Sequence, residues 1–370
     1  MTRRTAFFLV VLVVGLPPCA CCAQSPSGGR PVTRSRAEIE SLIEKVGKTP
    51  PNRWNTTQLD YPPSLDLSWP LRPEGPWNAH ENVGQYIWDI INPNPGRWKE
   101  GIKLVNHLMI RHQDDPAKLV RSMETLGHMY HNLLEDWARA AFWWRTAERY
   151  DGYVDPVGLA HCYWKLGSKE MAVEALAEIG SDYTRHGAVI KLWADMGEYD
   201  KALVLAERKA AEGMPVIAYL TAGDTCRLAG RYPEALAYYQ KVLTVQDDLG
   251  REGDIKKDRE RAQGSIQAIR FFDSLDVAEV ADGVYTANSI AYAGPLHVEV
   301  TVKGGRIEAV RVTKHEEKQF YSALTDTPSQ IVRKQSVKGV DAVTGATMTS
   351  EAIINATAKA LAGGMWKKAK

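Results

Sequence analysis

The chain has 370 residues, of which 44% are apolar and 25% charged, and its formal net charge is +1 at pH 7. These proportions are those of an ordinary soluble globular protein, and the length predicts two or three domains. A charge so close to zero, with no basic tract in the sequence, gives no reason to expect nucleic acid or an anionic membrane surface as a partner.

The N-terminus has the order of a secretory signal peptide. Two arginines precede an apolar run over residues 6–16, and a stretch of small residues then ends near Ala23. A basic region, an apolar region and a small-residue cleavage site in this order are typical of such signals. The apolar run is short for a transmembrane helix. We therefore predict a signal peptide over residues 1–23 and an exported protein, periplasmic or otherwise extracytoplasmic.

The mode of membrane attachment, if there is one, stays open at this point. An uncleaved signal would act as an anchor, and Cys19, Cys21 and Cys22 allow a lipoprotein although the residues before them make a poor lipobox. A mature transmembrane helix is not expected. Cleavage of the signal leaves Cys162 and Cys226, which are predicted to be buried thiols. The sequence has no C-x-x-C-H haem site and no cysteine cluster for an iron–sulfur centre.

Residues 24–80 are predicted to form a proline-rich linker, or an arm packed along the next domain. A short helical pattern covers residues 37–46. Long regular elements are excluded elsewhere because proline removes a backbone donor and fixes φ. The prolines concerned are Pro50, Pro51, Pro62, Pro63, Pro70, Pro73 and Pro76.

Residues 81–250 repeat a pattern of small and aromatic residues. Gly127 and Ala160 are 33 residues apart, and so are Gly197 and Gly230. A period of about 34 residues is typical of stacked helical hairpins, each of which buries its apolar face against a neighbour. The pattern resembles tetratricopeptide repeats. The resemblance implies an all-α solenoid of helical hairpins, and we expect it to act as a scaffold for a protein partner.

The aromatic and histidine residues of these repeats have two interpretations. The tryptophans could line a recognition groove, but aromatics at such helical positions usually pack in the core between repeats. The histidines could bind a metal, but no carboxylate or further histidine has a convincing spacing, so no metal site is predicted. The residues are Trp137, Trp143, Trp144, Trp164 and Trp193, and His128, His131 and His161. Residues 251–280 are predicted to form a solvated connecting or capping helix.

Residues 281–370 predict a small α+β domain. A first strand begins near residue 283, and residues 295–302 alternate apolar and polar side chains. Gly304-Gly305 is a hairpin turn that leads into a return strand over residues 307–313. A helix near residues 328–335, a short strand that ends at Asp341 and a final helix complete the prediction. Glu316 and Glu317 are expected in a solvated loop.

The stretch before the final helix carries the clearest motif, D-A-V-T-G-A-T-M-T-S over residues 341–350. Thr349 or Ser350 is the expected N-cap, and Glu351 suits the positive end of the helix dipole. Thr347 would then lie just upstream of a helix N-terminus, where backbone N–H groups favour a phosphate. No bulky side chain precedes it, so its hydroxyl is predicted to be accessible.

This motif resembles the D-x-x-[S/T]-G-A-T flavinylation motif of the FMN-binding domain. That family includes the C subunit of the sodium-pumping NADH:quinone oxidoreductase and the G subunit of the Rnf complex. The resemblance implies that Thr347 carries FMN through a phosphoester made by an ApbE-type flavin transferase. It also implies that Asp341 leads the motif and that Thr344, Gly345 and Ala346 form its body.

The resemblance extends over the rest of the domain. Thr349 follows the motif as in the family, and the loop Tyr292-Ala293-Gly294-Pro295 matches the family's glycine loop, which would place Gly294 near the flavin. The alternative to a cofactor-binding role is that both segments are ordinary turns, one before a helix and one before a strand. The fold class expected is therefore multidomain: a tetratricopeptide-like solenoid followed by a small α+β FMN-binding domain.

The function expected is that of an electron relay. No nicotinamide-binding G-x-G-x-x-G precedes a helix, and no acid–base pair accompanies the motif. Covalent FMN would accept electrons from one redox protein and pass them to another, with the repeats as the partner-binding scaffold. Two alternatives stay open. One is a flavin-dependent reductase with a substrate site between the domains, and the other is a repeat adaptor whose flavin fold carries no FMN.

Overall fold

The computed structural model describes residues 32–69, 75–179, 187–246 and 252–368. The predicted signal peptide and the three N-terminal cysteines lie outside these residues. Within them, no helix is long and apolar enough to cross a membrane. Cys162 and Cys226 are buried free thiols, as expected from the sequence.

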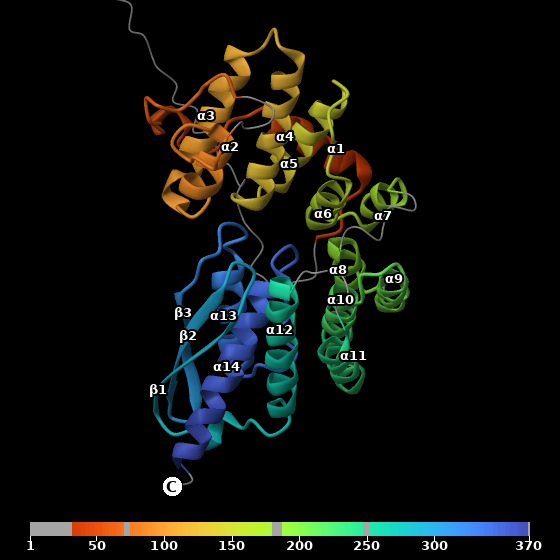
Figure 1. Ribbon diagram of the computed structural model, residues 1–370, viewed down its shortest axis with the longest axis vertical. Helices are drawn as coiled ribbons and strands as arrows, with labels where there is room; N and C mark the ends of the chain where they lie inside the picture. The colour runs from red at the N-terminus through yellow and green to blue at the C-terminus, as the bar shows by residue number, and fades with distance from the viewer. Residues whose placement is uncertain (1–31, 70–74, 180–186, 247–251, 369–370) are drawn as a thin grey trace, which may run out of the picture. The chain divides into compact units, whose positions relative to one another are not determined.

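The first part of the described chain is helical (Figure 1). Between α2 and α3 the backbone passes through a π-helical turn, Ile87–Ile91, and a 3₁₀ turn, Pro95–Arg97. The helices are α1 (Arg36–Gly47), α2 (Val83–Tyr86), α3 (Trp98–Arg111), α4 (Pro116–Asn132), α5 (Trp137–Glu148), α6 (Pro156–Leu166), α7 (Lys169–Ala177), α8 (Gly187–Asp195), α9 (Tyr199–Ala211), α10 (Pro215–Leu228) and α11 (Tyr232–Thr244).

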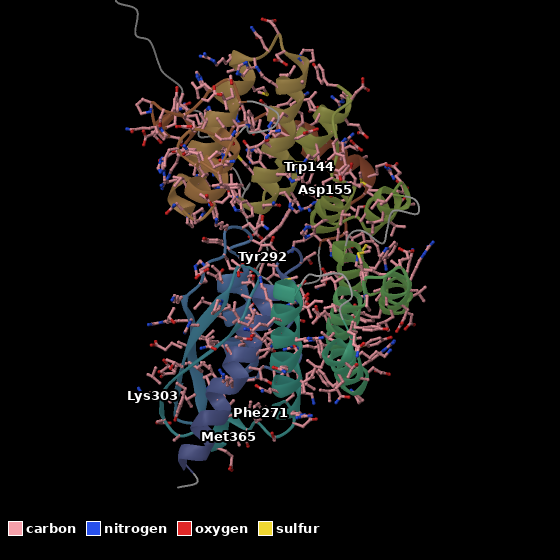
Figure 2. All side chains as sticks on the ribbon, viewed as in Figure 1. Trp144, Asp155, Phe271, Tyr292, Lys303 and Met365 are labelled. Carbon is pink, nitrogen blue, oxygen red and sulfur yellow. The ribbon has the colours of Figure 1, made fainter. Side chains whose placement is uncertain are left out.

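Helices α4 to α11 form four hairpins, α4–α5, α6–α7, α8–α9 and α10–α11. Small residues lie where the helices cross: a Cβ on Gly127 would meet Trp144, and one on Gly223 would meet Tyr239. Trp144 is fully buried, and its contact explains why glycine stands opposite it (Figure 2). These hairpins confirm the all-α repeat part of the expected fold.

The proline-rich segment contributes one helix to this region. Ser35 caps α1 in a capping box with Glu38, and Ile39 and Ile43 are buried where α1 packs on α5. Just before it, the Arg34 backbone N–H donates to the Gly167 carbonyl over 3.0 Å. This helix therefore adds to the core of the repeats instead of connecting two domains.

Helix α12 (Glu252–Phe271) differs from the expected solvated helix. Between its charged residues, α12 carries side chains that pack against α10 and α11 and against α14. Ala262, Ser265, Ile266 and Ile269 are buried there. The helix forms and connects the two parts, but it is not solvated on all sides, because a stripe of small and apolar side chains lies between its charged residues. One hydrophobic core consequently runs from the last hairpin through α12 into the sheet domain.

The C-terminal part is a three-stranded antiparallel sheet in the order β1-β2-β3, with helices on one face (Figure 1). Strands β1 (Gly283–Ile290) and β2 (Pro295–Lys303) pair along their length, and β3 (Arg306–Lys314) follows through the predicted Gly304-Gly305 turn. Helix α14 (Thr347–Lys368) covers β1 and β2, and α13 (Ala323–Lys334) covers β3. This is the expected α+β domain.

The short strand predicted before Asp341 does not form. The backbone N–H and carbonyl of Asp341 bond instead to the side chain of Gln330, over 3.2 and 3.1 Å. Gly339 and Gly345, on either side, have positive φ values of 68° and 85°. Turn geometry at both ends leaves too few extended residues for a strand.

Candidate functional site

The motif lies at the start of α14, and Thr347 is the first residue of that helix. The expected N-caps, Thr349 and Ser350, lie inside the helix and are buried. Ser350 still stabilises the loop, because its hydroxyl accepts a hydrogen bond of 3.0 Å from the Val343 N–H. The helix begins earlier than predicted, because the Ala346 carbonyl already accepts a helical hydrogen bond of 2.9 Å from the Ser350 N–H. Thr347 therefore presents its side chain from the first turn.

Gly345 is required by the loop for two reasons. Its φ of 85° is in the left-handed region that glycine adopts without strain. A Cβ at this position would lie 2.9 Å from the ring of Phe320. Phe320 also has a positive φ, of 51°, and its N–H donates to the Asn132 carbonyl in the repeats over 2.7 Å. The motif thus packs on a residue that the repeats hold in place.

We predict that Gly345→Ala lowers the free energy of unfolding by about 1–3 kcal/mol, since it adds both backbone strain and a clash with Phe320. Thermal or denaturant unfolding measures this change. Gly363→Ala is the control: Gly363 lies in α14, and no atom lies within 4 Å of the position of an added Cβ. That control is expected to keep or slightly raise stability, and an equal loss in both variants would contradict the prediction.

A cavity of about 480 Å³ opens between the motif and the repeats. Five consecutive motif residues line it, namely Thr344, Gly345, Ala346, Thr347 and Met348. The rest of the lining comes from helices α4, α6 with its N-cap, α8, α10 and α12, from the loop between β1 and β2, and from the loop before α13. Its residues include His131, Asp155, His161, Lys191, Thr221, Asp224, Arg261, Tyr292, Glu317 and Phe320.

Helix α8 holds the motif through one carboxylate. The Thr344 hydroxyl donates to Asp195, and Asp195 also accepts a hydrogen bond from Lys191, one turn earlier on α8. Both charged side chains are almost fully buried, with 9% and 5% of the Lys191 and Asp195 side chains exposed. The sequence carries a signal for this ion pair that our prediction missed. A lysine and an aspartate four residues apart interrupt an otherwise apolar helix.

The loop between β3 and α13 docks on the repeats. The Asn132 side chain donates to Gln319 over 3.1 Å, and Glu135 accepts two hydrogen bonds from Ser322. Lys318 pairs with Asp89 over 2.7 Å. The expectation of a solvated loop was wrong for Glu317, which is buried and accepts from the Ala293 N–H over 3.2 Å. Burial raises the pKa of Glu317.

Two neutral histidines form part of the cavity wall. Burial lowers the pKa of His131 to about 4 and that of His161 well below its usual value. Asn132 donates through its amide to Gln319, so its oxygen accepts from His131 Nδ1 over 2.6 Å. His131 Nε2 therefore accepts from His161 Nδ1 over 3.0 Å. The remaining His161 Nε2 is an acceptor that is buried without a partner among the described residues.

Glu351 is buried in a cluster of charged residues and does not line the cavity. The sequence suggested only a favourable interaction with the positive end of the helix dipole. Burial and the Asp224 carboxylate raise the pKa of Glu351 to about 8, while Arg227 and Arg261 oppose that rise. Asp224 accepts a hydrogen bond from the Tyr239 hydroxyl over 2.7 Å. The cluster joins α10, α11 and α12 to the helix that carries Thr347.

The remaining predicted residues lie near the cavity without lining it. Asp341 is exposed at the start of the loop. Thr349 is buried and bonds to Glu317. Gly294 does not line the cavity, whereas Tyr292 in the same loop does. Tyr292 stands at the end of the sheet nearest the repeats (Figure 2).

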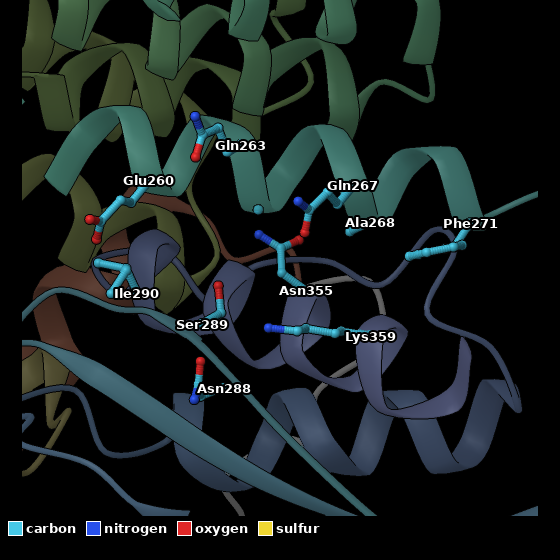
Figure 3. A pocket seen from close by; sticks show the side chains of 11 residues that line it. Glu260, Gln263, Gln267, Ala268, Phe271, Asn288, Ser289, Ile290, Asn355 and Lys359 are labelled. Atoms are coloured by element: carbon cyan, nitrogen blue, oxygen red, sulfur yellow. The ribbon is translucent and has the colours of Figure 1, made fainter. Parts of the chain in front are cut away.

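A second cavity, of about 240 Å³, lies between α12, β1 and α14 (Figure 3). It is lined by the amide side chains of Gln263, Gln267, Asn288 and Asn355, with Glu260 and Lys359 at its edge. None of the motif residues reaches it. Over the ranges that the structure describes, no group of three or more His, Cys, Asp or Glu side chains is arranged to hold a metal ion.

Comparison with known proteins agrees with this arrangement. Residues 291–362 match the FMN-binding domain. Residues 157–179, which cover α6 and α7, match the tetratricopeptide repeat. An uncharacterized protein of Treponema pallidum (strain Nichols) is 45% identical over 86 residues, which are 23% of this chain and 24% of that protein. The chain thus spans about a quarter of the length of that relative. No solved structure matches the chain.

The cavity fits the cofactor of an FMN-binding domain. Pockets of about 300–1,000 Å³ are usual for small-molecule and cofactor sites, and this one falls within that range. The unpaired Nε2 of His161 can accept a hydrogen bond from an N–H donor, such as the imide of an isoalloxazine ring. Gly345 and Ala346 leave the approach to the Thr347 hydroxyl free of bulky side chains.

Proposed function

We propose that this chain is an exported flavoprotein that carries FMN through a phosphoester on Thr347 and relays electrons between redox partners. The observation that carries the proposal is the cavity itself, because Thr344, Gly345, Ala346 and Thr347 line one face of a space large enough for the cofactor. The match to the FMN-binding domain supports the same cofactor. The signal-peptide pattern of residues 1–23 supports export.

Each part of the chain has a role in this proposal. The bound flavin supplies reversible redox chemistry, and the protein supplies attachment, orientation and electrostatics. Thr347 offers the hydroxyl, and the loop that Ser350 and Phe320 hold in place orients it. The neutral pair His131 and His161 and the side chain of Lys191 shape the polar part of the cavity. The repeats would also bind the redox partner, which raises its effective concentration near the flavin.

A second function is favoured by the position of the cavity between the repeats and the motif. A flavin-dependent reductase would bind its acceptor in this space beside the cofactor. Such an enzyme would oxidise its own reduced flavin with a small acceptor and no other protein. A relay would require a protein partner for the same step.

The test uses the full chain, expressed with an ApbE-type flavin transferase and with a matched culture that lacks the transferase. We expect yellow protein whose colour survives denaturation only in the first culture. After reduction with dithionite, reoxidation by small quinones alone would favour the reductase, whereas oxidation that needs an added redox protein would favour the relay. Protein that carries no flavin would overturn both and leave the repeats as the functional part.

A further inference from the structure

The repeats contribute a buried lysine to the cavity that the motif lines. Lys191 lies on α8 and lines the cavity, whereas its partner Asp195 does not. The ion pair is therefore oriented, with its positive end at the cavity and its negative end behind the wall, against Thr344. Burial by itself would lower the pKa of Lys191, but Asp195 and, more weakly, Asp341 and Glu351 outweigh it, so that the pKa is raised.

The other charged groups of the cavity are already matched. Asp155 caps α6 and accepts from the backbone N–H groups of Val157 and Gly158 over 3.1 and 3.0 Å. Arg261 pairs with Asp258 over 3.3 Å and lies 3.9 Å from Asp224. Glu317 is bonded to Ala293 and Thr349, and His131 and His161 are neutral. Among the described residues of the lining, Lys191 and Arg261 are the cations. Arg261 has the Asp224 carboxylate beside it in the lining, whereas the counter-charge of Lys191 lies outside the cavity.

We propose that Lys191 sets the reduction potential of the flavin held on Thr347, so that the repeats form the second half of the cofactor site as well as a scaffold. This inference rests on the function proposed above. Uptake of two electrons and one proton from a reductant leaves a flavin with one more negative charge than before. A fixed cation nearby, in a site that largely excludes water, stabilises that reduced form relative to the oxidised one.

The two members of the ion pair predict opposite results. Lys191→Gln removes the positive charge but keeps a donor for Asp195. At a fixed potential, the ratio of reduced to oxidised flavin is expected to fall about tenfold, which is about 30 mV for a two-electron couple. Asp195→Asn removes the negative charge but keeps an acceptor for Thr344. It also removes the main group that raises the pKa of Lys191, so it is expected to raise the potential at low pH, where Lys191 stays protonated, and to lose that rise as pH increases.

The potential is measured by spectroelectrochemical titration of the full-length flavinylated protein, after intact mass has shown equal loading. Lys169→Gln is the matched control, because Lys169 pairs with Glu198 over 2.5 Å in the repeats but does not line the cavity. This control is expected to leave the potential unchanged. It separates a local effect from a change in total charge.

The two variants are expected to shift the reduction potential in opposite directions. A general loosening of the fold would shift both variants in the same direction, so shifts of the same sign at low pH, or no shift in either, would overturn the inference. If Lys191→Gln does not fold, Asp195→Asn decides alone at the low-pH end of the titration: a higher potential supports the inference, and an unchanged or lower one overturns it. If the wild-type protein carries no flavin, both the inference and the proposed function are overturned. If the wild type and both variants carry flavin but have the same reduction potential, only the inference is overturned.

Discussion

Thr347→Ala is expected to abolish covalent flavin completely while the fold is retained. The phosphoester needs the Thr347 hydroxyl. Thr349 and Ser350 share the first turn of α14, but both are buried, and the Ser350 hydroxyl accepts from the Val343 N–H. The nearest hydroxyls are committed elsewhere, since Thr344 donates to Asp195, and Thr349 bonds to Glu317. The fold should tolerate alanine in the first turn of α14, because alanine has the highest helix propensity. The change removes one oxygen and one methyl group from the cavity wall.

The measurement is the intact mass of protein expressed with a flavin transferase. Wild type should gain the mass of one FMN less water and keep its yellow colour after denaturation, and Thr347→Ala should show neither. Thr325→Ala is the matched control, because Thr325 is an exposed threonine of α13 in the same domain. Flavin that persists on the Thr347→Ala protein would show that another side chain is the attachment site.

The second large effect concerns the pH dependence of stability, which we expect to be dominated by Glu351. Its pKa of about 8 in the folded chain lies above the usual carboxyl value of 4.5, because the side chain is buried beside Asp224. The folded state therefore keeps a proton that the unfolded state loses as pH rises above 4.5. The stabilisation is fully present below that value and is lost as pH rises toward 8.

Glu351→Gln should remove this dependence, since glutamine stays neutral and can still donate to Asp224. Between pH 5 and pH 8, wild type is expected to lose on the order of 4 kcal/mol more stability than the variant. Denaturant unfolding at both pH values measures the difference. Glu234→Gln, an exposed change on α11, should behave like wild type. Equal losses in wild type and Glu351→Gln would show that this carboxyl does not hold its proton.

This cluster has a consequence for the site. Glu351 lies one turn after Thr347, and its neighbours Asp224, Arg227 and Arg261 belong to α10 and α12. Arg227 also donates to Asn355, on the next turn of α14, over 3.0 Å. The helix that carries the motif is therefore fastened to the last repeat hairpin by buried polar groups, so a change in their charge also acts on the wall of the cavity.

The sequence by itself was sufficient for the architecture. The spacing of Gly127, Ala160, Gly197 and Gly230 predicted helical hairpins, because small residues are needed wherever two helices cross or turn tightly. Alternating valines in residues 295–302 and the Gly304-Gly305 pair predicted the sheet in the same way. The motif from Thr344 to Thr347 can also be recognised in the sequence, since the small size and order of its residues are visible without any contact, and its role in holding FMN stays a prediction.

What only the tertiary structure decided is the other half of the site. Lys191 and His161 line the same cavity as the motif, Asp195 accepts from Thr344, and Phe320 packs on Gly345. No local sequence pattern relates these residues to the motif. The same reason explains why the burial of one face of α12, of Glu317 and of Glu351 was not expected. From sequence alone a charged residue is predicted to be exposed to solvent. Its burial depends on a partner that only folding brings close, from another part of the chain.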